Sequence, residues 1–214
     1  GRDAGHLALQ SGIAGGADVI LIPELTPQLD DRVLENICQQ IVQLRQCDRQ
    51  FALVVVAEGV RNPAGEKEKY IGDVLAQQIQ ASGRRLCATG RPEYCCLKDL
   101  ETRATTLGHI QRSGIPSSCD RRLAAVFGHK AIELIDAEQY QQLVVWSQGQ
   151  VASQPLERVM PIIKERHRIH RCPSPVEPDS PWVRTAQDLG IYVGDRRRKA
   201  DSTLSPPALL SEKS

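Results

Sequence analysis

The sequence lacks the features that mark membrane proteins and general nucleic-acid binders. It contains no run of about 18 consecutive apolar residues, so no transmembrane helix is predicted, and it shows no secretory signal pattern. Its 27 lysines and arginines nearly balance 26 aspartates and glutamates, which gives a net charge of +1. Because nucleic-acid and membrane-surface binding usually need a clear positive excess, we expect neither partner and a cytoplasmic location.

The sequence also lacks paired cysteine motifs. None of the cysteines forms a CxxC pair, their number is odd, and adjacent Cys95 and Cys96 are poorly placed to chelate one metal ion together. We therefore expect reduced thiols rather than disulfides or zinc, and we assign no metal ligands. The seven cysteines are Cys38, Cys47, Cys87, Cys95, Cys96, Cys119 and Cys172.

Apolar runs alternate with amphipathic stretches along most of the chain. With 214 residues and 41% hydrophobic content, the chain can bury one core. Strand, helix and strand with glycine-rich joints indicate an α/β fold, doubly wound, with a mostly parallel sheet and helices on both faces. We expect one unit at 1–165 and a linker, short helix and flexible basic tail at 166–214. Helices are predicted at 6–14, 27–47, 70–81, 118–135 and 182–189, strands at 17–23 and 51–57, a hairpin at 142–146 and 150–152, a short element at 156–166, and an extended piece at 191–193.

The stretch at 102–114, TRATTLGHIQRSG, has the composition of an anion site. It begins like a strand and then places Arg103, His109 and Arg112 within one short segment that ends in glycine. Guanidinium groups offer forked donors to phosphate oxygens, and a histidine can bond a hydroxyl or phosphate with little added charge. The alternative is that Arg103 is a solvated charge and His109 a half-buried histidine with its hydrogen bonds satisfied.

Two further polar positions fit the same edge of the predicted sheet. Glu58 follows the second strand, and ligands of such sheets gather at the carboxyl ends of the strands. Arg2 lies in a loop that leads into the first helix, where unpaired N–H groups and the helix dipole favour an anion. A polar cap at Glu58 and a surface arginine at Arg2 are the ordinary alternatives.

Two motifs resemble one known family. LGHIQRSG is very similar to the LGHIQRGG signature of the phosphofructokinases, and GRDAGHLALQSGIAGGADVILIPE is similar to their MGRxxG loop, Ala-rich helix and AGGA-strand-PE segment. The two motifs occur in the family's order and at about its separation. The chain resembles the ATP-dependent bacterial type over about residues 1–150, with cyanobacterial members as one candidate subgroup and a weaker similarity at WVRTAQDLGIYVGD.

The resemblance implies a 6-phosphofructokinase, which transfers phosphoryl from ATP, with Mg²⁺, to the 1-hydroxyl of fructose 6-phosphate and yields fructose 1,6-bisphosphate in glycolysis. It implies that Arg2 lies near the reacting centre, that Glu58 holds sugar hydroxyls, and that His109 with Arg112 binds the 6-phosphate. Arg103 is similar to the family's contact to the neighbouring subunit's sugar phosphate, which implies a homotetramer with shared sites.

The same resemblance places the start of this chain in the middle of a family member. We therefore expect a C-terminal fragment that is inactive alone, with the catalytic base and most contacts to ATP and Mg²⁺ upstream of Gly1. Gly16, Asp18 and Arg49 match positions of the family's effector site, although ordinary polar residues flanking strands explain them equally well.

Two alternatives and two departures accompany this reading. The protein could use pyrophosphate as the donor, or it could be a non-catalytic regulatory homologue that binds sugar phosphate. Residues 83–100 form an insertion, interpreted as an elaborated surface loop or a hairpin. Ser113 replaces a family glycine and would cost about 1 kcal/mol of strain if that position has positive φ.

Overall fold

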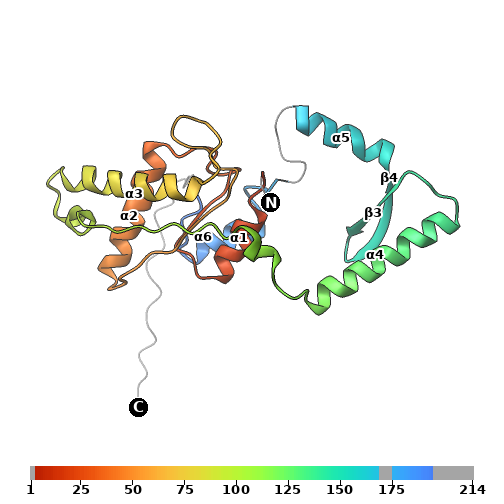
Figure 1. The fold of residues 1–214 in the computed structure, drawn as a ribbon. Coiled ribbons are helices and arrows are strands. Elements are labelled where there is room, and N and C mark those ends of the chain that lie inside the picture. The colour runs from red at the N-terminus through yellow and green to blue at the C-terminus, as the bar shows by residue number, and fades with distance from the viewer. Residues whose placement is uncertain (1–2, 169–174, 195–214) are drawn as a thin grey trace, which may run out of the picture.

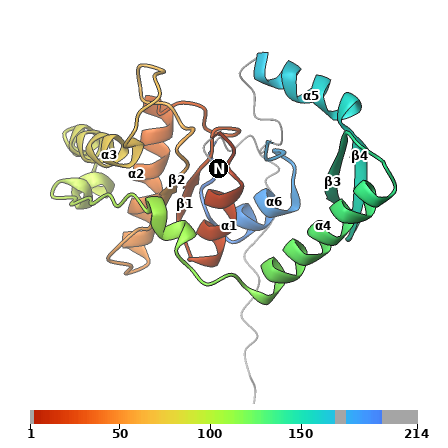
Figure 2. The ribbon, with the colours of Figure 1, turned by 45° about the vertical axis from the view of Figure 1, so that its right-hand side comes forward.

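The computed structural model describes residues 3–168 and 175–194, which form a body and a separate arm (Figures 1 and 2). The body contains α1 (His6–Ala14), β1 (Val19–Leu21), α2 (Asp31–Gln46), β2 (Val54–Val56), α3 (Ile71–Cys87), the 3₁₀ helix η1 (Pro92–Leu97) and α6 (Pro181–Asp188). The 3₁₀ helix η2 (Gly108–Arg112) precedes the arm, which contains α4 (Ser118–Asp136), β3 (Gln142–Ser147), β4 (Gln150–Pro155) and α5 (Leu156–Arg168). None of the described helices has the length and apolar content needed to cross a bilayer.

A parallel strand pair forms the centre of the body. β1 and β2 pair in register, with Val19 opposite Val54. On the other side of β1, Tyr192 forms a parallel bridge with Val19, and the Ile20 N–H donates to the Tyr192 carbonyl at 2.8 Å. The two predicted strands and the extended piece at 191–193 are thus confirmed, although both strands are shorter than predicted.

Helices cover both faces of this strand pair. Val19 and Leu21 of β1 pack into a cluster with α2 and α3, whereas Ile20 and Ile22 pack into a second cluster with α1 and α6. Successive side chains of a strand point to opposite faces, so the apolar run of β1 supplies both clusters. The described residues therefore form a mixed α/β fold whose two sheets each have two strands.

The insertion at 83–100 is helical, so its interpretation as a surface loop or hairpin was wrong. α3 continues to Cys87, and η1 follows after a short turn. Leu97 is fully buried and Tyr94 nearly so, both in the cluster formed with α2. Polar residues occur throughout the insertion, and Tyr94 and Leu97 are buried because α2 packs against them. The sequence of the insertion alone therefore does not predict their burial.

The strand expected from residue 102 onward does not form. The Thr102 hydroxyl donates to the Ala76 carbonyl of α3 at 3.0 Å, and the Ala104 methyl lies against Gly72 near the start of the same helix. This segment therefore runs along α3, and it joins no described sheet.

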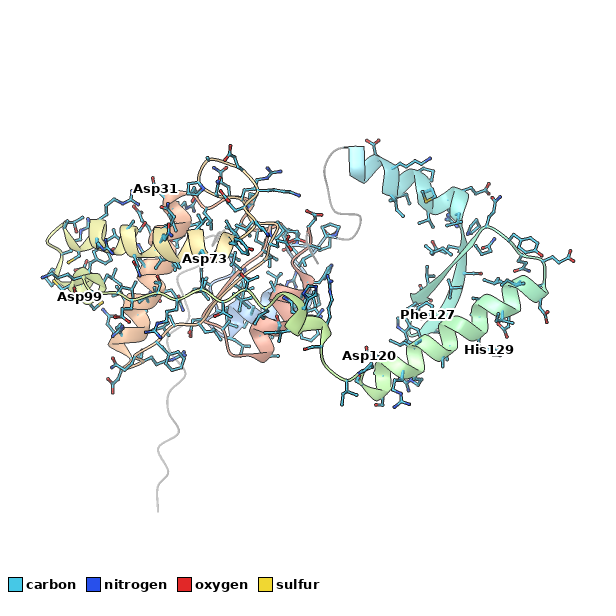
Figure 3. The ribbon with its side chains drawn as sticks, viewed as in Figure 1. Asp31, Asp73, Asp99, Asp120, Phe127 and His129 are labelled. Carbon is cyan, nitrogen blue, oxygen red and sulfur yellow. The ribbon has the colours of Figure 1, made fainter. Side chains whose placement is uncertain are left out.

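The arm follows the predicted helix and hairpin but has little core of its own. The predicted α4 stripe is half-buried at Leu123 and Phe127 and buried at Leu134. Figure 3 labels Phe127 on this helix. Ile135, beside the stripe, stays exposed. The exposed large apolar side chains of the arm are Val126, Ile132, Ile135, Tyr140, Leu143, Trp146, Met160 and Ile162.

Candidate functional site

The carboxyl ends of β1 and β2 lie at one edge of the body and carry two glutamates. Ala57 closes β2, where its N–H donates to the Leu21 carbonyl at 2.9 Å, and the exposed Glu58 follows directly. Glu24 follows β1 and is half-buried. Since the strands are parallel, both glutamates occupy the edge at which ligands of α/β sheets usually bind.

Glu24 contacts the start of α1 directly. Its two carboxylate oxygens accept from the Gly5 N–H at 3.0 and 3.1 Å, and Oε1 also accepts from the Val176 N–H at 2.8 Å. The start of the first helix therefore has one fewer free N–H group for an anion than the sequence predicts, because the Glu24 carboxylate already accepts from Gly5. The sequence placed Glu24 at a strand end but gave no signal for these contacts, which span 19 and 152 residues.

The loop after Glu58 folds back toward the same edge. Asn62 Oδ1 accepts from the Glu66 N–H at 2.8 Å, and Asn62 Nδ2 donates to the Glu68 carboxylate at 2.8 Å. These two bonds hold the loop together. Lys67 then reaches Asp3, the residue next to Arg2, at 2.8 Å. Both partners of this ion pair are more than half exposed, so it orients the loop more than it stabilises the fold.

His109 and Arg112 lie together on η2. Side chains three residues apart eclipse in a 3₁₀ helix, so the imidazole and the guanidinium share one side of the helix. Both are exposed, as is the whole of η2. An imidazole and a forked cation on one exposed side can bind a phosphate group.

Ser113, just after η2, is unstrained. Its φ is −91°, and its hydroxyl donates to the Ile110 carbonyl at 2.9 Å. The positive φ that would have strained a serine lies instead at Gly108, with φ +49°. The conditional strain at Ser113 therefore does not arise.

Within the described residues, Arg103 makes no hydrogen bond or ion pair with the other candidate residues. Arg103 is 90% exposed and lies 3.8 Å from the equally exposed Glu101, a weak contact that leaves its guanidinium accessible. Arg2 lies outside the described residues. The convergence of Arg2, Glu58, Arg103 and the His109–Arg112 pair on one ligand stays a prediction.

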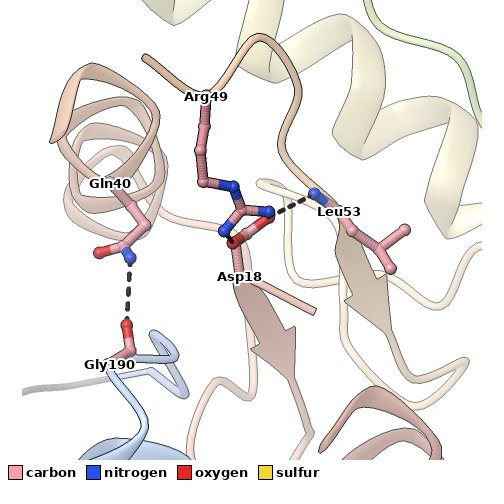
Figure 4. A network of polar contacts seen from close by, with 5 residues as sticks. All are labelled: Asp18, Gln40, Arg49, Leu53 and Gly190. Carbon is pink, nitrogen blue, oxygen red and sulfur yellow. Dashed lines mark hydrogen bonds and ion pairs between the residues drawn. The ribbon is translucent and has the colours of Figure 1, made fainter. Parts of the chain in front are cut away.

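The three effector candidates lie at the opposite, amino end of β1. Asp18, which is 6% exposed, pairs with Arg49 at 2.6 Å and accepts from the Leu53 N–H at 2.8 Å (Figure 4). The Arg49 guanidinium also lies 5.4 Å from the centre of the Phe51 ring. Gly16 precedes them with φ +68° and open space where a side chain would be. The structure thus joins Asp18 to Arg49, and each satisfies the other.

Two small cavities and the thiols lie apart from these positions. Cavities of about 210 and 190 Å³ lie at the surface of α2, and neither is lined by a candidate residue. Six cysteines of the described part are free thiols, and no three potential metal ligands cluster in residues 3–168 and 175–194.

Comparison with known proteins identifies relatives for most of the chain. The chain is 40% identical to the ATP-dependent 6-phosphofructokinase of Thermosynechococcus vestitus, over 92% of this chain and 47% of the relative. It is 40% identical to ATP-dependent 6-phosphofructokinase 2 of a Nostoc species, over 92% of this chain and 51% of the relative. The chain thus spans about half the length of these relatives.

Structural and family comparisons agree. The structure of phosphofructokinase from Saccharomyces cerevisiae matches with a TM-score of 0.58 and 28% identity, over 78% of this chain and 20% of that one. The family described as "Phosphofructokinase" matches residues 1–135, which include both glutamates, the effector candidates and η2. The chain belongs to the phosphofructokinase family.

Proposed function

We propose that this chain is the acceptor-binding half of an ATP-dependent 6-phosphofructokinase. The observation that carries the proposal is the pairing of His109 with Arg112 on one exposed side of η2, within the motif LGHIQRSG of a family member. Their combined donors suit the three oxygens of a sugar phosphate. In this proposal they bind the 6-phosphate of fructose 6-phosphate.

The other acceptor residues complete this site. Glu58, at the carboxyl end of β2, accepts hydrogen bonds from the sugar hydroxyls, and Arg2 lies near the hydroxyl that reacts. Arg103 reaches a sugar phosphate in a neighbouring subunit of a tetramer, which agrees with its 90% exposure. Each sugar phosphate would thus contact Arg112 of one subunit and Arg103 of its neighbour. These contacts would hold the sugar for in-line attack, and such positioning is a large part of phosphoryl-transfer catalysis.

ATP and Mg²⁺ belong, in this proposal, mainly to the remaining length of a protein of the relatives' size. Bound Mg²⁺ would neutralise charge on the transferred phosphoryl group. The same remaining length would cover the exposed apolar side chains of the arm, among them Ile132 and Trp146. It would also extend β1 and β2 into the larger doubly wound sheet.

The regulatory and boundary assignments are proposals of the same kind. Asp18 and Arg49, with Gly16, would hold an effector at the amino end of β1, where an anionic ligand would have to compete with Asp18 for the guanidinium. The unit at 1–165 would carry the sugar-phosphate site. The described part of 166–214 packs into the core of the body through α6 and Ile191. The protein would act in the cytoplasm.

An Arg112→Ala substitution in the full-length protein tests the proposed phosphate contact. We expect KM for fructose 6-phosphate to rise by at least about 100-fold, because a charge-assisted bond to phosphate contributes about 1.5–3 kcal/mol, two are lost, and each 1.4 kcal/mol is about tenfold. The KM for ATP should change less than about twofold.

Arg91→Ala is the matched control, since Arg91 is an exposed arginine just before η1 and is not among the candidate residues. It should leave both KM values near those of the wild type. Equal losses for both substrates in the Arg112 variant would refute the assignment.

A further inference from the structure

We propose that Glu24 is a positioning residue. It fixes Gly5, just before α1, against the C-terminal segment (residues 175–194) and thereby sets the affinity for the sugar phosphate. The inference rests on the proposed function, because it takes Arg2, three residues before Gly5, as a sugar-phosphate contact. Glu24 itself is not placed in contact with the substrate.

The first step is the geometry of the carboxylate. Oε1 accepts two N–H groups at once, from Gly5 at 3.0 Å and from Val176 at 2.8 Å, and Oε2 accepts from Gly5 at 3.1 Å. These donors come from opposite ends of the described chain. One half-buried side chain at the end of β1 therefore joins two segments that no strand or helix links.

The second step is the close packing of Gly5 against β1 and Glu24. Gly5 is buried, and a Cβ added there would overlap the Ile22 side chain and lie 2.8 Å from Glu24 Oε2. The backbone of the loop thus rests directly on β1. Because the carboxylate also sits at the positive end of the α1 dipole, removing it releases a favourable contact from the helix start.

The third step is the anchoring of the other donor. Val176 is 3% exposed and packs in the cluster that also contains Leu9 of α1, Ile22 of β1 and Val183 of α6. The C-terminal segment is therefore fixed by its own packing, and it can hold the carboxylate of Glu24 in place. This arrangement makes residues 175–194 a support for the backbone at Gly5.

Neutral and truncated variants of Glu24 in the full-length protein test the inference. Glu24→Ala should raise KM for fructose 6-phosphate on the order of tenfold, with kcat within about twofold and KM for ATP unchanged, because misplacing a positioning group weakens substrate binding. Glu24→Gln keeps an acceptor oxygen at Oε1 and should recover most of the affinity. Glu93→Ala, on the exposed surface of η1, is the matched control and should match the wild type.

Amide hydrogen exchange on the same variants separates the outcomes. Faster exchange at Gly5 and Val176 in Glu24→Ala, together with the selective rise in KM and its recovery in Glu24→Gln, supports the inference. Faster exchange with an unchanged KM overturns it and leaves Glu24 a structural contact only. A wild-type protein that neither binds nor turns over fructose 6-phosphate instead overturns the proposed function.

Discussion

At the scale of single residues, burial changes the pKa of one thiol. Cys38 is fully buried on α2, and this desolvation raises the pKa of its thiol from 9.0 to about 11, although Arg85 acts in the opposite direction. In the unfolded chain the thiol ionises first, so the unfolded state gains stability as the pH rises above 9. The contribution is therefore fully present below pH 9 and is lost as the pH approaches 11.

Unfolding in urea at several pH values checks this expectation. Between pH 8 and pH 10.5 the wild type should lose on the order of 2 kcal/mol more than Cys38→Ala, since each unit of pKa difference corresponds to about 1.4 kcal/mol. Cys47→Ala, at an exposed cysteine, should keep the wild-type slope. Parallel pH profiles for Cys38→Ala and the wild type would contradict the account.

The sequence selects candidate residues for the site, but it does not reveal the contacts around them. Motif spacing selected His109 and Arg112, and η2 places them on one side. It could not predict that Glu24 bonds Gly5 and Val176, because hydrogen bonds over 19 and 152 residues leave no local pattern.

At the scale of elements, the first turn of α4, where the arm follows η2, is stabilised by a cap. The Ser117 hydroxyl accepts from the Asp120 N–H at 3.2 Å, and the Asp120 carboxylate accepts from the Ser117 N–H at 2.9 Å, which makes a reciprocal capping box. Hydrogen bonds from the Ser117 side chain and backbone lower the pKa of Asp120, so this cap is present above the ordinary range of a carboxyl and is lost as the pH falls through the lowered value.

Replacing Ser117 with alanine should destabilise α4 by about 1 kcal/mol, the usual cost of a lost N-cap. Hydrogen exchange in the first turn of α4 measures the effect. Ser118→Ala is the matched control, because Ser118 is the first helical residue and makes no capping bond in the described structure. If both variants exchange alike, the cap contributes nothing measurable.

The elements that the sequence predicted well have strong local signals. The predicted hairpin agrees with β3 and β4, and the helix predicted at 182–189 agrees with α6. Alternation and capping are local signals, so the sequence alone shows them. Residues 94 and 97 escaped prediction because their burial depends on α2, and the strand expected at 102 failed because α3, and not a strand, lies beside it.

At the scale of the whole molecule, the body holds the strand ends and the arm exposes apolar side chains. Both features agree with a chain that spans about half the length of its relatives. The account therefore predicts that catalysis needs a second half. The described residues offer cations and carboxylates for a sugar phosphate, but no cluster of metal ligands.

The most direct test is an assay of fructose 1,6-bisphosphate formation by the full-length protein and by this chain alone, with ATP, Mg²⁺ and fructose 6-phosphate. The account predicts product from the full-length protein, with ATP preferred over pyrophosphate, and none from the chain alone. A folded full-length protein that forms no bisphosphate from either donor would contradict the account.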